Sequence, residues 1–184
     1  DVGAHGTAPG HLDTPGDVAS LPEGAVCVAD TWNHRLLIFS KEQGAAPRVI
    51  GGDGPGDYGA GKGHGQFKYP TSAASDGTAL YVADGANNRV QKLRLADGAH
   101  LGVVGKYGDL LGQFSNPAGL CVAAGTLYVC DRANNRIVVL GTDLTWRDTF
   151  GRKGSGDGEF DDPEAVAAHS GELYVVDECN HRVQ

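Results

Sequence analysis

The sequence of 184 residues contains no methionine, and aromatic residues make up only 7% of it. It also lacks any apolar run approaching the roughly 20 residues that a membrane-spanning helix needs. The sequence therefore predicts no membrane helix. Because even an initiator methionine is missing, we expect the chain to be a processed or excised piece.

Positive charge is also scarce. The chain has 15 Lys and Arg residues against 23 Asp and Glu residues, which gives a net charge of -8 at pH 7. A surface that binds RNA phosphates needs clustered positive charge. This balance makes RNA an unfavoured partner.

Motifs for metal binding and catalysis are absent. The four cysteines form no C-x-x-C pair, and the seven histidines form no H-E-x-x-H motif. A G-x-G-x-x-G match at 54–59 is followed by more glycines instead of a helix, so we reject it as a nucleotide site. We expect no catalytic residues, no metal and no other cofactor. We interpret the cysteines as buried free thiols, which favours an intracellular location.

Glycine, in contrast, is abundant, with 29 residues. Many glycines belong to a decapeptide, G-x-x-x-G-x-[FL]-x-x-P, that occurs four times. Each copy is followed by an alternating apolar run and then by D-x-x-N-[HN]-R. The decapeptides span 6–15, 61–70, 108–117 and 154–163, and the second motif begins at Asp30, Asp84, Asp131 and Asp177.

The spacing within the copies is nearly constant. Proline and aspartate are 15, 14, 14 and 14 residues apart, and aspartate always precedes arginine by five. Each copy contains short apolar runs separated by Gly, Asn, Asp and Pro, which predicts a meander of four strands. A small sheet repeated about every 45 residues is typical of propeller blades. The predicted repeats are 6–51, 61–105, 108–151 and an incomplete 154–184.

Several segments carry a family resemblance. GQFSNPAGL, TLYVCDRANNRIVVL, GEFDDPEAV and ELYVVDECNHRVQ resemble NHL repeats. The resemblance implies an all-β fold, a β-propeller of four-stranded antiparallel blades, as one segment over 1–184. About four blades are present, so we expect an incomplete, open part of a six-bladed ring that remaining blades or another chain would complete.

The recurring D-x-x-N-x-R residues are interpreted as structural. We expect Asp and Arg to face each other across two strands as an exposed ion pair, which contributes about 0.2–1 kcal/mol. The residues are Asp30, Asn33, Arg35, Asp84, Asn87, Arg89, Asp131, Asn134, Arg136, Asp177, Asn180 and Arg182.

Departures from the repeat are better candidates for binding. In a four-stranded meander, the D-x-x-N-x-R turns and the decapeptides emerge on the same side, which we call the loop face. Long connections on a rigid scaffold are common binding sites. The candidates on this face are Trp32, His34, Tyr58, Lys62, Lys106, Tyr107, Arg132, Arg152 and Lys153.

The resemblance implies a non-catalytic scaffold domain that binds a protein partner through the loop face. Related domains often follow a ubiquitin-ligase module. One alternative is a propeller enzyme resembling the peptidyl-hydroxyglycine amidating lyases, which hold zinc with channel histidines. The expected channel-lining positions, such as Val18, Ala73 and Leu120, contain no histidine. RNA binding, known for some NHL domains, is the other alternative.

Overall fold

The computed structural model describes residues 5–54, 56 and 59–184. Over these residues the secondary structure consists of β-strands and single 3-10 turns, without an α-helix. No helix in this part of the chain is long and apolar enough to cross a membrane. Candidate Tyr58 lies outside the described residues.

The strands form four sheets, one for each repeat. The first blade contains β1 (Asp17–Ser20), β2 (Val26–Asp30), β3 (Arg35–Phe39) and β4 (Arg48–Gly51). The second contains β5 (Pro70–Ser75), β6 (Ala79–Asp84), β7 (Arg89–Arg94) and β8 (His100–Val104). The third contains β9 (Pro117–Ala123), β10 (Thr126–Asp131), β11 (Arg136–Gly141) and β12 (Trp146–Phe150). The fourth contains β13 (Pro163–His169), β14 (Glu172–Asp177) and β15 (Arg182–Val183).

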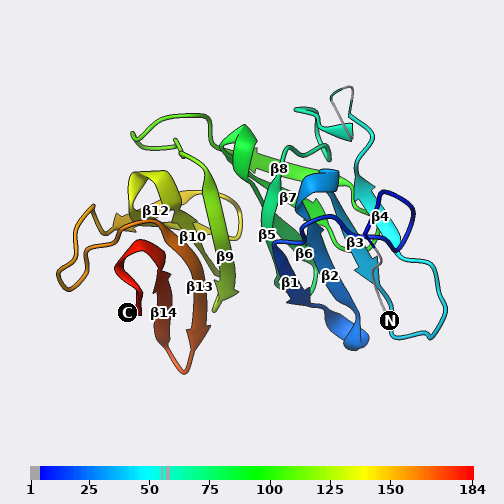
Figure 1. Cartoon of the computed structure of the whole chain (residues 1–184). Coiled ribbons are helices and arrows are strands. Elements are labelled where there is room, and N and C mark those ends of the chain that lie inside the picture. Colours follow the sequence, from blue (N-terminus) through cyan, green and yellow to red (C-terminus); the bar gives the residue numbers. More distant parts are fainter. Residues whose placement is uncertain (1–4, 55, 57–58) are drawn as a thin grey trace.

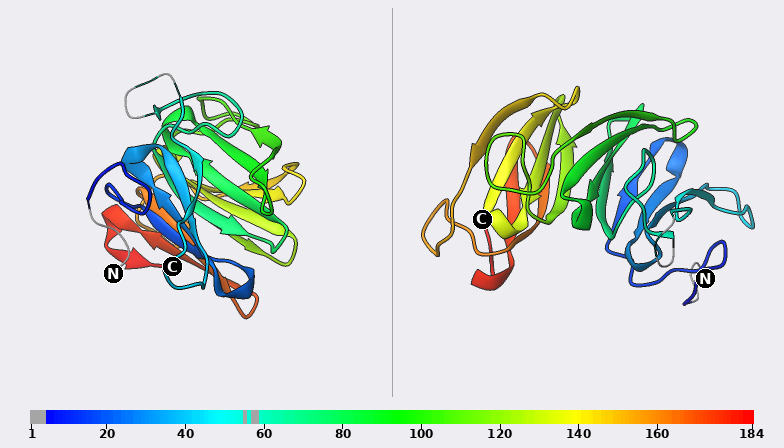
Figure 2. Two further views of the ribbon diagram at one scale, coloured as in Figure 1. Left: turned by 90° about the vertical axis from the view of Figure 1, so that its right-hand side faces the viewer. Right: turned by 90° about the horizontal axis from the view of Figure 1, so that it is seen from above.

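Each sheet is an antiparallel meander in which consecutive strands pair. The motif residues set the register, because Asp84 pairs with Arg89 where β6 turns into β7. The sheets follow one another in chain order, with the first blade at one side of the molecule and the fourth at the other (Figure 1). The views in Figure 2 show the sheets stacked face to face like blades. The expected all-β propeller of about four blades is confirmed.

The first strands of the blades surround a common cavity. Its volume is about 490 Å³, and its lining comes from β1, β5, β9, β13 and neighbouring residues. Asp17 in the first blade accepts a hydrogen bond from the Ser72 hydroxyl at 2.5 Å, and Ser72 in turn accepts one from the Leu120 amide at 3.2 Å. These bonds link three blades around the axis.

The hydrophobic core lies between blades. Tyr81 of the second blade is fully buried and belongs to the same cluster as Leu127 and Leu140 of the third. Cys27 and Leu36 of the first blade similarly share a cluster with Leu80 of the second. Burial of one such large apolar side chain stabilises the fold by about 1.5–3 kcal/mol. A blade therefore needs a neighbour to complete its core.

The first and fourth blades are not joined directly. Within the described residues, no strand pairing, hydrogen bond or ion pair connects them. The lack of such contacts agrees with the expectation that the ring is open between the first and fourth blades. Completion of the ring by remaining blades or by another chain stays a prediction.

Candidate functional site

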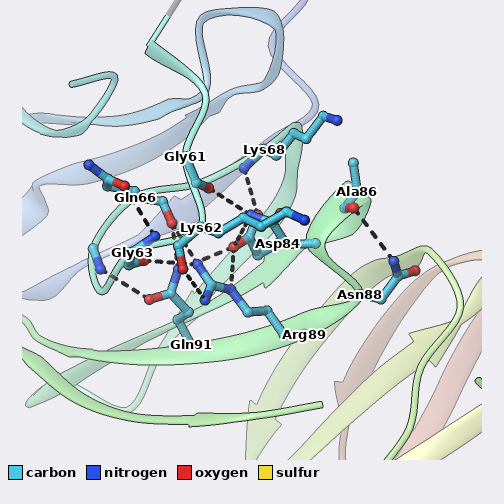
Figure 3. Close-up of polar contacts among 12 residues, drawn as sticks. Gly61, Lys62, Gly63, Gln66, Lys68, Asp84, Ala86, Asn88, Arg89 and Gln91 are labelled. Atoms are coloured by element: carbon cyan, nitrogen blue, oxygen red, sulfur yellow. Dashed lines mark hydrogen bonds and ion pairs between the residues drawn. The ribbon is translucent and has the colours of Figure 1, made fainter. Parts of the chain in front are cut away.

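The loop face is built on a hydrogen-bonded network that recurs in every blade. In the second blade, the carboxylate of Asp84 accepts bonds from the Lys68 amide at 2.7 Å, from Asn87 Nδ2 at 3.0 Å and from Arg89 Nε at 2.7 Å (Figure 3). The turn is thereby joined to the decapeptide of the same blade.

The arginine fixes the backbone of that decapeptide. The guanidinium of Arg89 donates to the carbonyls of Lys62 at 2.8 Å, Gly63 at 2.9 Å and Gln66 at 3.0 Å (Figure 3). In the third blade, Arg136 makes the same contacts with Asp109, Leu110 and Gln113. Because only backbone carbonyls accept these bonds, the arrangement holds whatever side chains the loop carries.

The expectation of exposed ion pairs is wrong. The decapeptide folds over the turn, so Asp30, Asp84, Asp131 and Asp177 have no exposed surface. Burial raises the pKa of Asp84 and Asp131 above the usual value, while the N–H donors and the arginine oppose this rise. A buried charge needs such partners, since an unpaired one is costly.

A second contact links each turn to the next blade. His34 Nδ1 accepts a hydrogen bond from the Tyr69 amide at 2.9 Å. The amide oxygens of Asn88 and Asn135, at the equivalent positions, accept bonds from the following decapeptides. His34, a predicted binding candidate, is therefore only 3% exposed. Burial, followed by the charge of Lys68, lowers the pKa of His34.

Two other candidates lie beside that histidine. The indole of Trp32 is 53% exposed, and its ring contacts Tyr69 edge-on at 5.8 Å between centroids. Lys62 is exposed and borders a hollow of about 690 Å³. We call it the loop-face hollow, and its lining residues are His34, Gly56, Ala60, Gly61, Lys62, Lys68 and Tyr69.

Three exposed apolar side chains lie on and directly before the third blade's decapeptide, and only one of them was predicted as a binding candidate. Tyr107 is 75% exposed, and Leu110 and Leu111, which were not among the candidates, are 67% and 75% exposed. We call these three residues the apolar tip. The missed signal was the replacement by leucine of loop residues that are small or polar in the other copies, such as Ala8 and Gly156.

The basic candidates on the last two blades face acidic partners. Arg132 bonds Glu164 at 3.0 Å, Arg152 contacts Glu159 at 2.8 Å, and Lys153 lies 3.3 Å from Asp161. Lys106 is exposed. These residues alternate with acidic groups and do not form a basic track.

The cysteines are free thiols, as expected, but they are not all buried. Cys27 and Cys130 are buried, Cys121 is partly so, and Cys179 is exposed. Burial raises the pKa of Cys27 to about 12, which makes this thiol a poor nucleophile at neutral pH. Within the described ranges, no three His, Cys, Asp or Glu side chains gather in a way that could hold a metal ion.

Four antiparallel blades around a shared axis define the class of β-propellers. A family model described as "NHL repeat" matches residues 12–39, 114–140 and 160–184, in the first, third and fourth blades. The resemblance to the NHL-repeat family is thus confirmed: the chain carries NHL repeats. A comparison with curated proteins found no significant match.

Solved structures of several kinds share the fold. The structure of a nidogen/laminin complex aligns with a TM-score of 0.71 and 20% identity, over 94% of this chain and 60% of that one. An auxiliary nutrient binding protein from Bacteroides ovatus aligns with a TM-score of 0.68 and 15% identity, over 94% of this chain and 48% of that protein. Streptogramin B lyase aligns with a TM-score of 0.64 and 14% identity, over 92% of this chain and 53% of that enzyme. The chain thus spans about half of their length, and at such identities the likeness shows the fold alone.

Proposed function

We propose that this chain is a non-catalytic scaffold domain that binds a protein partner through its loop face. The observation that carries the proposal is the apolar tip. Leu110 and Leu111 expose large apolar side chains from one decapeptide, and Tyr107 does so directly before it; exposed apolar groups that cluster are typical of interaction sites.

Rigidity of the tip supports the same function. Arg136 donates to the carbonyls of Asp109 and Leu110, and Asn134 donates to that of Gly108 at 2.9 Å. The loop is therefore held in shape before any partner arrives. A pre-organised loop loses less conformational entropy on binding, so more of the contact energy contributes to affinity.

The comparisons are compatible with this function without specifying it. One similar structure is named as a protein complex, whereas another is named as a lyase. The enzyme alternative of the amidating-lyase type requires zinc, and stoichiometric zinc in the purified protein would favour it. A position behind a ubiquitin-ligase module rests on the family resemblance alone.

The proposal is tested by chemical cross-linking in a lysate followed by affinity capture of the chain. We expect the variant L110S/L111S to lose a specific partner that the wild-type chain retains. The matched control is L101S/V103S, because Leu101 and Val103 are also exposed apolar residues but lie on strand β8. Equal recovery of the partner with both double variants would overturn the proposal.

A further inference from the structure

The junction between the first and second blades differs chemically from the others on the loop face. Lys62 stands where the other decapeptides have Thr7, Asp109 and Ser155. Lys68 replaces Asp13, Ser115 and Asp161, and Tyr69 replaces Thr14, Asn116 and Asp162. At three positions where other copies are acidic or small and polar, this copy therefore carries two cations and an aromatic ring.

These residues converge on the loop-face hollow. Lys62, Lys68 and Tyr69 all line it, and Trp32 lies against Tyr69. Among the residues that the structure describes, no carboxylate lies within salt-bridge distance of either ammonium group. In a chain with a net charge of -8, this hollow therefore brings together two positive charges that no described carboxylate neutralises directly.

The buried histidine adds a directional donor. His34 Nδ1 accepts the bond from the Tyr69 amide, so this nitrogen carries no proton. The neutral imidazole then has its proton on Nε2. Because burial and Lys68 lower the pKa of His34, the neutral form is the one present at pH 7. The hollow is thus lined by a neutral histidine with an N–H donor as well as by the two lysines.

We infer that the loop-face hollow binds a short carboxylate-bearing segment of the partner protein, an inference that rests on the proposed function. The ammonium groups of Lys62 and Lys68 pair with Asp or Glu side chains of the segment. The exposed ring of Trp32 contacts an apolar neighbour of those side chains.

The rest of the loop face argues for a short acidic segment over a nucleic acid. A phosphate backbone would need several unpaired cations in a row. Beyond the hollow, Arg132, Arg152 and Lys153 are already paired with Glu164, Glu159 and Asp161. Of the predicted loop-face cations outside the hollow, only Lys106 has no acidic partner among the described residues, so the positive region accommodates only a few negative charges.

The test uses fluorescence polarisation with three labelled probes: the peptide Glu-Phe-Glu-Leu-Glu, its isostere Gln-Phe-Gln-Leu-Gln, and a ten-nucleotide oligouridine. We expect the acidic peptide to bind at least tenfold more tightly than the isostere, with an affinity that falls as salt rises. The oligouridine should bind more weakly than the acidic peptide. Equal binding of the two peptides, or tighter binding of the RNA, would overturn the inference.

Variants assign the binding to the hollow. K62S/K68D introduces residues that the other decapeptides already carry at these positions, so the fold should be retained. We expect this variant to lose at least tenfold in affinity for the acidic peptide. W32A introduces the residue that two other blades carry as Ala86 and Ala133, and it should weaken binding further.

The control K41D changes an exposed lysine between β3 and β4 and should bind the acidic peptide as the wild type does. Loss with K41D equal to that with K62S/K68D would contradict the assignment.

The two proposals can fail separately. If K62S/K68D still captures the partner that L110S/L111S loses, the scaffold function stands and the acidic-segment inference is rejected. If the acidic peptide binds the hollow but neither double variant affects partner capture, the proposed function is rejected instead.

Discussion

Gly105 lies directly under the ring of Phe114. A Cβ on this glycine would come within 2.6 Å of Phe114 Cδ2 and within 2.8 Å of the Asn88 carbonyl oxygen. Gly51 with Phe67 and Gly151 with Phe160 form the same contact at the two other blade junctions. The end of each outer strand is thus fitted to the phenylalanine of the next decapeptide.

The first prediction concerns this glycine. We expect G105A to lower the free energy of unfolding by about 2–4 kcal/mol, because it adds overpacking to a backbone angle of +112° that disfavours alanine. The control G112A also has a positive φ, at +75°, but a backbone that alanine adopts at lower cost and open space around its Cβ, so it should lower the free energy of unfolding by about 1 kcal/mol. Denaturant unfolding measures both. Equal losses would show that the ring contact is unimportant.

The second prediction concerns the buried carboxylates. D131N removes the charge that pairs with Arg136 at 2.7 Å and leaves a largely buried guanidinium without its partner. We expect D131N to lower the free energy of unfolding by about 3 kcal/mol. D97N weakens the exposed Arg94–Asp97 pair at 2.8 Å, which solvent screens, and should lower the free energy of unfolding far less than D131N does. A D131N protein as stable as D97N would contradict the role of the network.

The third prediction separates a side-chain bond from a backbone requirement. Asn88 has a φ of +54° and accepts a hydrogen bond from the Asn116 amide at 2.8 Å. N88G relieves the backbone and removes this bond together with the long, exposed bond from Asn88 Nδ2 to the Ala86 carbonyl, which should lower the free energy of unfolding by about 1 kcal/mol. N88A also introduces backbone strain and should cost about 1 kcal/mol more. Thermal unfolding measures both, and the reverse order of stability would refute the assignment.

Part of this architecture could be predicted from the sequence and part could not. The constant distance from Asp84 to Arg89 fixed the strand register, because a turn of given length has few pairings. The burial of Asp84 was not predictable, since it depends on the loop carbonyls of residues 62–66 folding back onto Arg89. The buried Gln91, which bonds Gln66 and Asp84, was missed because the motif was ended at the arginine, although Gln184 holds the equivalent position in the fourth blade and makes the equivalent bonds.

The candidate site shows the same division. Trp32 was recognised because it interrupts a recurring pattern, and it is indeed exposed. The burial of His34 depends on Tyr69, which comes 35 residues later and belongs to the next blade. Leu110 and Leu111 occupy variable positions of the decapeptide, where a motif-based comparison places no weight.

The fourth prediction concerns pH. The rings of His64 and His100 stack at 3.8 Å between centroids, and the buried His100 Nε2 has no hydrogen-bond partner among the residues that the structure describes. Burial, followed by the charges of His64 and Arg89, lowers the pKa of His100, whereas its bond with the Gly102 backbone raises it. The unfolded chain therefore binds a proton more readily at this residue than the folded chain does.

His100 therefore makes a contribution to stability that is fully present when the pH is above the pKa of histidine in the unfolded chain, about 6.5. This contribution is lost as the pH falls toward the lower pKa of the folded state. We expect urea unfolding to show a decline between pH 7 and pH 5 that is smaller in H100Q. The control H169Q, at an exposed histidine of the fourth blade, should show the wild-type decline. An unchanged pH dependence in H100Q would exclude this explanation.

The arginine contacts have a consequence for how this surface can change. The motif arginines bind the decapeptides only through main-chain carbonyl oxygens. These bonds do not depend on the side chains of the decapeptide, and they are made by Arg35, Arg89, Arg136 and Arg182. Mutation can therefore change the exposed side chains of one loop while the backbone conformation of the loop is retained. Transplanting Asp109-Leu110-Leu111 into the place of Thr7-Ala8-Pro9 should move the recognition surface to another sector of the disc.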